Sequence, residues 1–284
     1  MIKILLFVSN LFDRIERFWE KLIVRKYMGP FMVLVYLLSL FVIELKRWVV
    51  LPAPLNAMIP YSHFAAANVA FSLLLLFEVI DLIFGITSSF SRAFGKQLEI
   101  FAIILLRNCF KSFSEFSEPI VWEGISDTIL HILASSFGAL IIIIILVFYY
   151  RILQRFPICD DSEKRESFIY VKKAVSLFLF LTFLGIGAVS LFNYFSYGEF
   201  FQFFPVFFTV LILCDILMVL VALGYSSSFP VVFRNSGFAV STVLLRLALT
   251  APYYYDVALG IIAAVYAIGL TLTYNYFASV EFKD

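Results

Sequence analysis

The chain has 284 residues, of which 63% are hydrophobic, 19% are aromatic and 14% are charged, and its formal net charge is +1. A soluble domain carries roughly 25% charged residues, so this composition excludes an ordinary soluble protein. The near-neutral charge provides no basic field that would attract nucleic acid. We therefore predict an all-α polytopic membrane protein whose main partner is the lipid bilayer and which binds no nucleic acid.

The first segment, residues 1–28, has apolar residues at helical spacing with Lys and Arg between them. This pattern predicts an amphipathic interfacial helix lying on the anionic inner leaflet. The alternative is a helix packed on the protein's own cytoplasmic face. Because the apolar stretch is short and no A-x-A-like cleavage site follows it, we expect no signal peptide.

Eight apolar runs of roughly membrane length follow. They lie near residues 29–45, 63–86, 98–117, 129–150, 168–194, 201–224, 237–251 and 252–278. The seventh run is short and is closed by Pro252, so it is either a full crossing or a re-entrant segment. The expected organisation is a first four-helix half at 29–150, a charged cytoplasmic linker at 151–167 and a second four-helix half at 168–284.

Lys and Arg residues are distributed unequally between the two sides that this topology defines. Of the 21 in the chain, 16 fall on one side, only Lys46 and Arg47 on the other, and Arg107, Lys111 and Arg246 within the spans. The positive-inside rule then places both termini in the cytoplasm. We expect a multi-pass protein of a bacterial-type inner (plasma) membrane.

An internal repeat is indicated when the chain is shifted along itself so that Gly85 falls on Gly224. The segment 85–107, GITSSFSRAFGKQLEIFAIILLR, then lies over 224–246, GYSSSFPVVFRNSGFAVSTVLLR, and Arg107 falls on Arg246. Matched apolar residues carry little information in a membrane protein, but matched intramembrane arginines are rare. We predict two parallel four-helix pseudo-repeats, and the alternative is chance similarity between two apolar hairpins.

The two arginines are the main candidates for functional chemistry. Arg107 lies about nine residues into its span, which at about 1.5 Å per residue is roughly 14 Å deep. A lone arginine at that depth costs at least about 2.5–3.5 kcal/mol, so each needs a partner. Counting equal distances from the hairpin turns places Glu78 level with Arg107 and Asp215 level with Arg246, with Asp81 one turn nearer the inner face. The sequence predicts two intramembrane salt bridges.

The third span carries further charges at intervals of four residues, namely Glu99, Arg107, Lys111 and Glu115. Residues at this spacing share one slowly drifting helix face. Together with Glu78 and Asp81, this stripe is expected either to line an aqueous pathway or to form a structural salt-bridge network.

Metal and cofactor chemistry has little support in the sequence. His63, His131 and Asp127 lie near the outer ends of spans and are weak candidates for a metal site. Nucleotide-binding, zinc-protease and serine-hydrolase motifs do not occur, so we expect neither an enzyme nor a bound cofactor.

Two functions remain. The first is a transporter or channel for a small ion, in which the intramembrane arginines and carboxylates attract or relay the ion. The second is a non-transporting anchor, scaffold or assembly subunit of an inner-membrane complex, with a protein partner docked at the cytoplasmic face. The sequence favours no particular oligomeric state.

Overall fold

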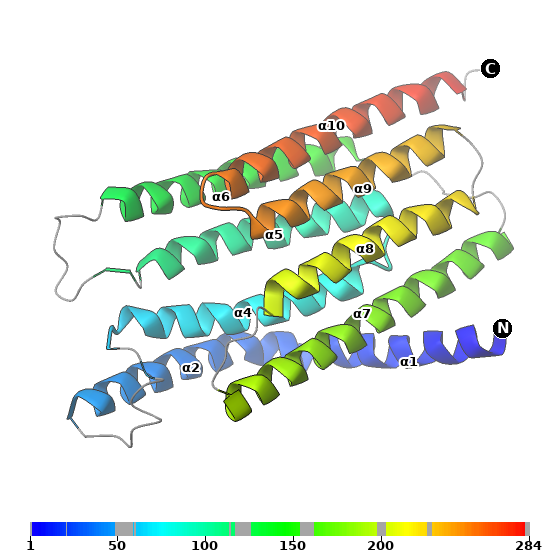
Figure 1. Cartoon of the computed structure of the whole chain (residues 1–284). Coiled ribbons are helices and arrows are strands. Elements are labelled where there is room, and N and C mark those ends of the chain that lie inside the picture. Colours follow the sequence, from blue (N-terminus) through cyan, green and yellow to red (C-terminus); the bar gives the residue numbers. More distant parts are fainter. Residues whose placement is uncertain are drawn as a thin grey trace.

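A computed structural model describes residues 2–20, 22–48, 59, 61–113, 115–116, 126–153, 162–197, 203–225 and 229–281. These residues form nine helices and no strand (Figure 1). The helices are α1 (Ile2–Glu20), α2 (Leu22–Trp48), α4 (Phe64–Gly85), α5 (Phe90–Phe113), α6 (Ser126–Ile152), α7 (Ser162–Tyr197), α8 (Phe203–Leu223), α9 (Phe229–Thr250) and α10 (Tyr255–Glu281). The expected all-α class is confirmed for the described residues.

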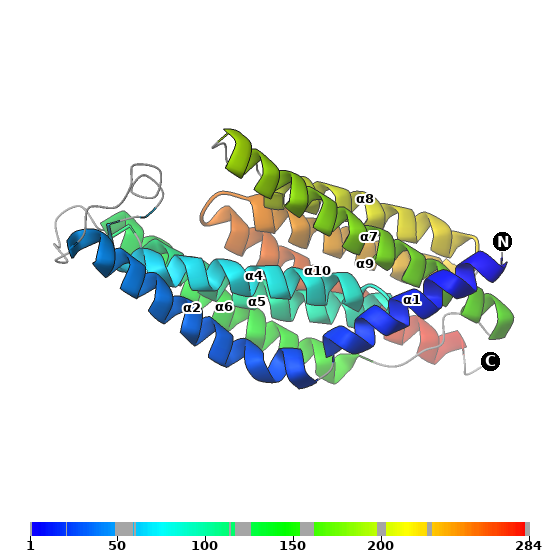
Figure 2. The ribbon, with the colours of Figure 1, turned by 90° about the horizontal axis from the view of Figure 1, so that it is seen from below.

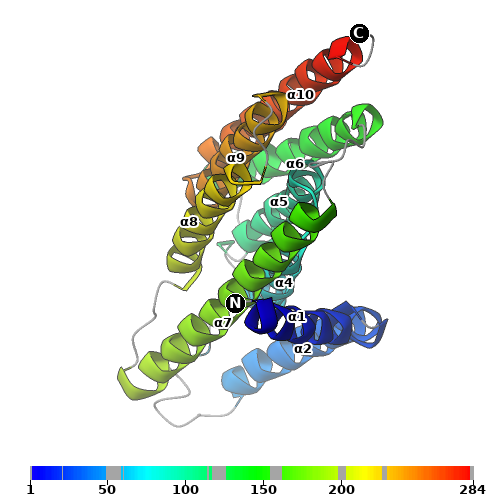
Figure 3. The same ribbon diagram turned by 90° about the vertical axis from the view of Figure 1, so that its right-hand side faces the viewer.

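The helices form an elongated bundle in which both ends of the chain lie at the same end (Figure 1). Helices α2, α4, α5 and α6 contact one another in sequence order, and we call them the first row. Helices α7, α8, α9 and α10 do the same and form the second row (Figure 3). The rows meet mainly where α5 packs on α9 and α6 packs on α10. Helices α5 and α9 therefore lie at the centre of the bundle.

Within the part of the chain that the structure describes, seven helices are long and apolar enough to cross a membrane. These candidate spans are Tyr27–Trp48, Phe64–Gly85, Ser126–Ile152, Glu166–Tyr194, Phe203–Leu223, Phe229–Thr250 and Tyr255–Phe277. The expected third span corresponds to α5, which has 24 residues but whose charges exclude it from this group. Helix α5 is packed between α4, α6 and α9, which enclose Gln97, whereas Arg107 is half-buried and Lys111 is exposed. An eighth crossing at α5 remains a prediction.

The two central helices begin earlier than the sequence predicted. Helix α5 starts at Phe90 rather than near 98, and α9 starts at Phe229 rather than near 237. The polar residues at these helix starts had indicated loops, but Gln97, Arg234 and Asn235 are buried in the bundle. With 22 residues, α9 is long enough for a full span. The short apolar run that suggested a re-entrant segment is only part of this helix.

Helix starts in the two rows are separated by a nearly constant offset. The offset from α4 to α8 equals that from α5 to α9, and the offset from α2 to α7 is longer by a single position. The offset from α6 to α10 is shorter, because the connection between α9 and α10 is shorter than that between α5 and α6. The common offset is the same as the shift that placed Arg107 on Arg246 in the sequence.

The N-terminal helix packs on the protein itself. Phe12 is fully buried beside Phe84 and Leu177, and the Trp19 indole donates a 2.6 Å hydrogen bond to Asp81. Figure 2 shows α1 crossing α7, where α1 also contributes an ion pair with Lys173. The arrangement corresponds to the alternative placement, a helix docked on the bundle. The predicted boundary at residue 28 was wrong, because residues 22–28 belong to α2.

The predicted linker at 151–167 falls mostly outside the described residues. Its central part, 154–161, is not described, and its last six residues already belong to α7. The first two residues, Arg151 and Ile152, complete α6.

Two apolar clusters form the core. One joins α5, α6, α9 and α10 around residues such as Phe94, Phe101 and Phe238. The other joins α4, α7 and α8 with one face of α5, around residues such as Ile83 and Leu211. Among the candidate spans α9 is the most buried and α2 the least. Gln97 of α5 and Arg246 of α9 lie beside residues of both clusters.

Candidate functional site

An ion pair between α8 and α9 lies in the interior of the bundle. The Arg246 Nε atom donates to Asp215 Oδ2 over 2.9 Å, and the two side chains are only 1% and 11% exposed. The sequence predicted this pair, and the structure confirms the contact. Such a pair is strongly destabilised when one partner is removed, because the other charge is left in an apolar interior.

Arg107 has different partners from those expected. Its Nε donates to the Phe71 carbonyl oxygen over 3.1 Å, and its Nη2 donates to the Ser72 hydroxyl over 3.0 Å. The predicted salt bridge with Glu78 was therefore wrong. Arg107 binds the preceding helix of its hairpin, as Arg246 does, but through neutral groups, and it is only half-buried.

Counting from the observed hairpin ends gives a different level from the one used in the sequence analysis. Because α4 ends at Gly85 and α5 begins at Phe90, the midpoint of the first hairpin is 87.5, and residue 68 is level with Arg107. Ser72 is one turn from that level, whereas Glu78 is more than two turns away. In the second hairpin the midpoint is 226 and residue 206 is level with Arg246, yet Arg246 bonds Asp215, which lies about two and a half turns nearer the turn. Level counted from the hairpin midpoint therefore does not by itself decide the partner. Arginine on the second helix of a hairpin reaches toward the turn, because helical side chains point toward their own N-terminus.

The predicted polar stripe of α5 does not line one pathway. Glu99 accepts 2.8 Å hydrogen bonds from Lys96 and from the Tyr150 hydroxyl of α6, while Arg107 faces α4. Eight residues at about 100° each leave these side chains roughly 80° apart around the helix. Lys111 and Glu115 are exposed. The charged residues of this stripe therefore contact different neighbouring helices, α6 for Glu99 and α4 for Arg107.

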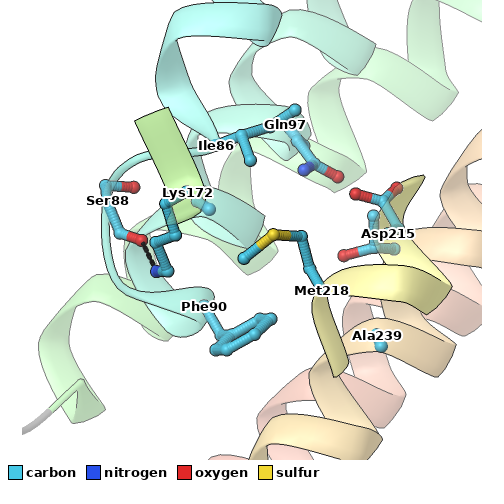
Figure 4. Close-up of a pocket in the computed structure, with 10 residues that line it drawn as sticks. Ile86, Ser88, Phe90, Gln97, Lys172, Asp215, Met218 and Ala239 are labelled. Atoms are coloured by element: carbon cyan, nitrogen blue, oxygen red, sulfur yellow. Dashed lines mark hydrogen bonds between the residues drawn. The ribbon is translucent and has the colours of Figure 1, made fainter. Parts of the chain in front are cut away.

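A cavity of about 30 Å³ adjoins the buried ion pair (Figure 4). Its polar lining comes from Ser88, Gln97, Lys172, Asp215 and Thr242. A cavity needs roughly 10–15 Å³ to hold one water molecule, so this one accommodates about two. The sequence analysis did not identify Gln97, Lys172 or Thr242. Gln97 had been placed in a turn, and Lys172 had been counted only as an inner-side charge.

A second, smaller cavity of about 10 Å³ lies against Arg246 and is also lined by Gln97. Its walls include Leu82 and Ile100 of one apolar cluster and Leu245 of the other. Gln97 thus lines both cavities, at the boundary between the clusters. We call Gln97, Asp215, Arg246 and Lys172, with these two cavities, the buried polar centre.

Two atoms of this centre lack hydrogen-bond partners among the described residues. They are the buried Nη2 of Arg246 and the buried Oε1 of Gln97, which together supply one donor and one acceptor. Buried polar groups are rarely left unsatisfied, and ordered water or an ion commonly fills such positions. The centre is therefore suited to hold a small polar guest.

Lys172 enters the bundle interior from α7 and is only 3% exposed. Its ammonium group donates to the Ser88 carbonyl oxygen and lies 4.9 Å from the Phe90 ring centroid and 5.0 Å from that of Phe168. These contacts orient the cation without neutralising its charge. The neighbouring Lys173 instead binds Asp13 of α1.

The weak metal candidates lie apart. His63 bonds Glu44 of α2 over 3.0 Å, whereas the His131 ring stacks on Tyr253 at a centroid distance of 4.2 Å. Asp127 lies in the first turn of α6. Among the described residues, no group of three or more His, Cys, Asp or Glu side chains is arranged to hold a metal ion.

The fold and its apolar spans define a multi-pass integral membrane protein of the helical class. No protein-family model, curated protein sequence or solved structure matches the chain.

Proposed function

We propose that this protein is a transporter or channel for a small ion, with its pathway between the two rows of helices. The observation that carries the proposal is the buried polar centre, in which the buried Arg246 has an unbonded Nη2. The smaller cavity lies against Arg246, and the larger one lies against its partner Asp215. Placing an ionisable group inside a membrane protein costs free energy, so such groups are rare, and they commonly mark ion or proton pathways.

The arrangement of the rows supports the same proposal. We propose that they are pseudo-repeats, because three of the four helix pairs keep nearly the same offset along the chain. Each contact in the first row, from α2 with α4 to α5 with α6, also has a counterpart in the second. Transporters built from such repeats often bind their substrate at the repeat interface. The buried polar centre lies at that interface, beside α5 and α9.

Sidedness follows from the charges. We propose that the bundle end holding both termini is cytoplasmic, since α4 and α8 end there and α5 and α9 begin there (Figure 1). Arg92 and Lys96 lie near this end, whereas Lys46 and Arg47 lie at the opposite one. The larger cavity, lined by Ser88 and Phe90, is nearest the proposed cytoplasmic end.

A second candidate is the anchor, scaffold or assembly subunit. It is favoured by the small size of the two cavities and by α2, which contacts α4 and α1 but leaves most of its apolar surface uncovered. A docked membrane partner at α2 would need no ion pathway.

Ion flux across the membrane of liposomes that contain the purified protein distinguishes these functions. We expect wild-type protein to carry at least one of potassium, sodium, protons or chloride across the bilayer faster than protein-free liposomes. Gln97→Leu should reduce this flux by roughly tenfold or more, because an apolar side chain then separates the two cavities and one hydrogen-bonding group is lost.

The matched control is Glu99→Gln on the same helix. Glu99 bonds Lys96 and Tyr150 away from the cavities, so its neutralisation should leave the flux unchanged. Wild-type protein that inserts as a single species yet carries none of the four ions would contradict transport and support the scaffold.

A further inference from the structure

We propose that the buried polar centre binds a small monovalent anion of halide size, held by Lys172 in the larger cavity. This inference rests on the proposed transport function and names the class of ion. It starts from the balance of buried charge around the cavity.

Buried cations outnumber buried carboxylates in this part of the bundle. Lys172, Arg234 and Arg246 are all buried, whereas Asp215 is the buried carboxylate beside them. Arg246 neutralises Asp215 directly. Arg234 lies with its guanidinium carbon 4.5 Å from the Tyr274 ring centroid, and it repels Lys172 electrostatically. Two positive charges thus remain without a bonded carboxylate in the described part of the chain.

An apolar interior penalises such unbalanced charge heavily. Carbonyl oxygens and aromatic rings stabilise a cation only in part, and a buried charge normally has a counter-charge. Lys172 lines the cavity on the side of Ser88, to whose carbonyl its nitrogen turns, and Gln97 and Asp215 lie on the other side with Met218 between them (Figure 4). An anion beside Lys172 would supply the missing negative charge and accept a hydrogen bond from the ammonium group.

The shape of the site limits the size of the guest. A cavity of about 30 Å³ holds one monatomic ion or about two water molecules. A metal cation is disfavoured because the Lys172 ammonium group lines the cavity and would repel it, and because the Asp215 carboxylate is already paired with Arg246. The geometry therefore favours chloride or bromide.

Equilibrium binding of radioactive chloride to the purified full chain in lipid nanodiscs tests the proposal without any flux. We expect saturable binding of about one ion per chain. Lys172→Met should lower the chloride affinity about tenfold or more, since a charged hydrogen-bond donor is lost. Lys96→Met removes the same charge from a surface pair with Glu99, so it should leave the affinity unchanged.

Bromide soaking keeps the test independent of whether Lys172→Met folds. Wild-type crystals should show one anomalous peak within hydrogen-bond distance of Lys172 Nζ. Absence of both saturable chloride binding and this peak would overturn the anion site, even where cation flux is observed. Anion binding without any ion flux would retain the site and remove the transport function.

Discussion

Replacing Arg246 by leucine is expected to lower the free energy of unfolding by about 3–5 kcal/mol, because the Asp215 carboxylate would remain buried without its cation. Equilibrium unfolding of the purified protein in mild detergent measures this loss. The surrounding cavities, at about 30 and 10 Å³, provide room for only a few water molecules to solvate the orphaned charge.

Arg107→Leu is the matched comparison, because the two arginines occupy equivalent positions in the two hairpins. Arg107 is half-buried and bonds only the Phe71 carbonyl and the Ser72 hydroxyl. The loss of two hydrogen bonds, about 1–2 kcal/mol, is offset by removing a cation from an apolar surface. We expect a change within about 1 kcal/mol. If both substitutions lowered the free energy of unfolding equally, the ion pair with Asp215 would not give Arg246 a larger contribution to stability than Arg107.

Gly260→Ala is expected to destabilise the fold by about 1–3 kcal/mol, because α10 packs too closely on α5 to accept a methyl group. A Cβ atom at Gly260 would lie 2.2 Å from Cε1 of Phe101, whose ring is itself buried in the core. Ala263, Ala264 and Ala267 continue this small-residue face, as is common where membrane helices approach closely. Thermal unfolding in detergent measures the effect.

Gly269→Ala on the same helix is the control, since nothing lies within 4 Å of its added methyl group. Alanine loses less backbone conformational entropy on folding than glycine does. This variant should therefore be as stable as the wild type or about 0.5–1 kcal/mol more stable. The double substitution Phe101→Leu with Gly260→Ala should recover part of the lost stability. Destabilisation by Gly269→Ala equal to that by Gly260→Ala would refute the close α5–α10 contact.

The apolar runs predicted most of the spans because hydrophobicity over about 20 residues is a strong signal. Arg246 and Asp215 were found for a related reason: charges are conspicuous in such runs and need partners. The starts of α5 and α9 were not found, because they contain polar residues such as Gln97, Arg234 and Asn235. A hydrophobicity pattern that assumes lipid around each span reads such residues as a loop. Neighbouring helices, rather than lipid, enclose them.

Tertiary packing determined the features that the sequence did not reveal. Lys172 and Lys173 are adjacent in the chain, yet one enters the cavity and the other binds Asp13, because successive helical side chains point about 100° apart. Asp81 was expected beside the charged stripe of α5, in an aqueous pathway or a salt-bridge network, but it accepts a hydrogen bond from Trp19 of α1. The sequence alone does not specify which helix neighbours which, so neither assignment could be derived from spacing.

A double-mutant cycle on Asp215 and Arg246 tests the central claim most directly, namely that these two charges neutralise each other inside the bundle. Unfolding free energies are measured for Asp215→Leu, Arg246→Leu and the double substitution. We predict that each single substitution is strongly destabilising and that the double variant is more stable than either, with a coupling of at least about 3 kcal/mol. A double variant whose loss equals the sum of the two single losses would show that the charges are independent and would contradict the account.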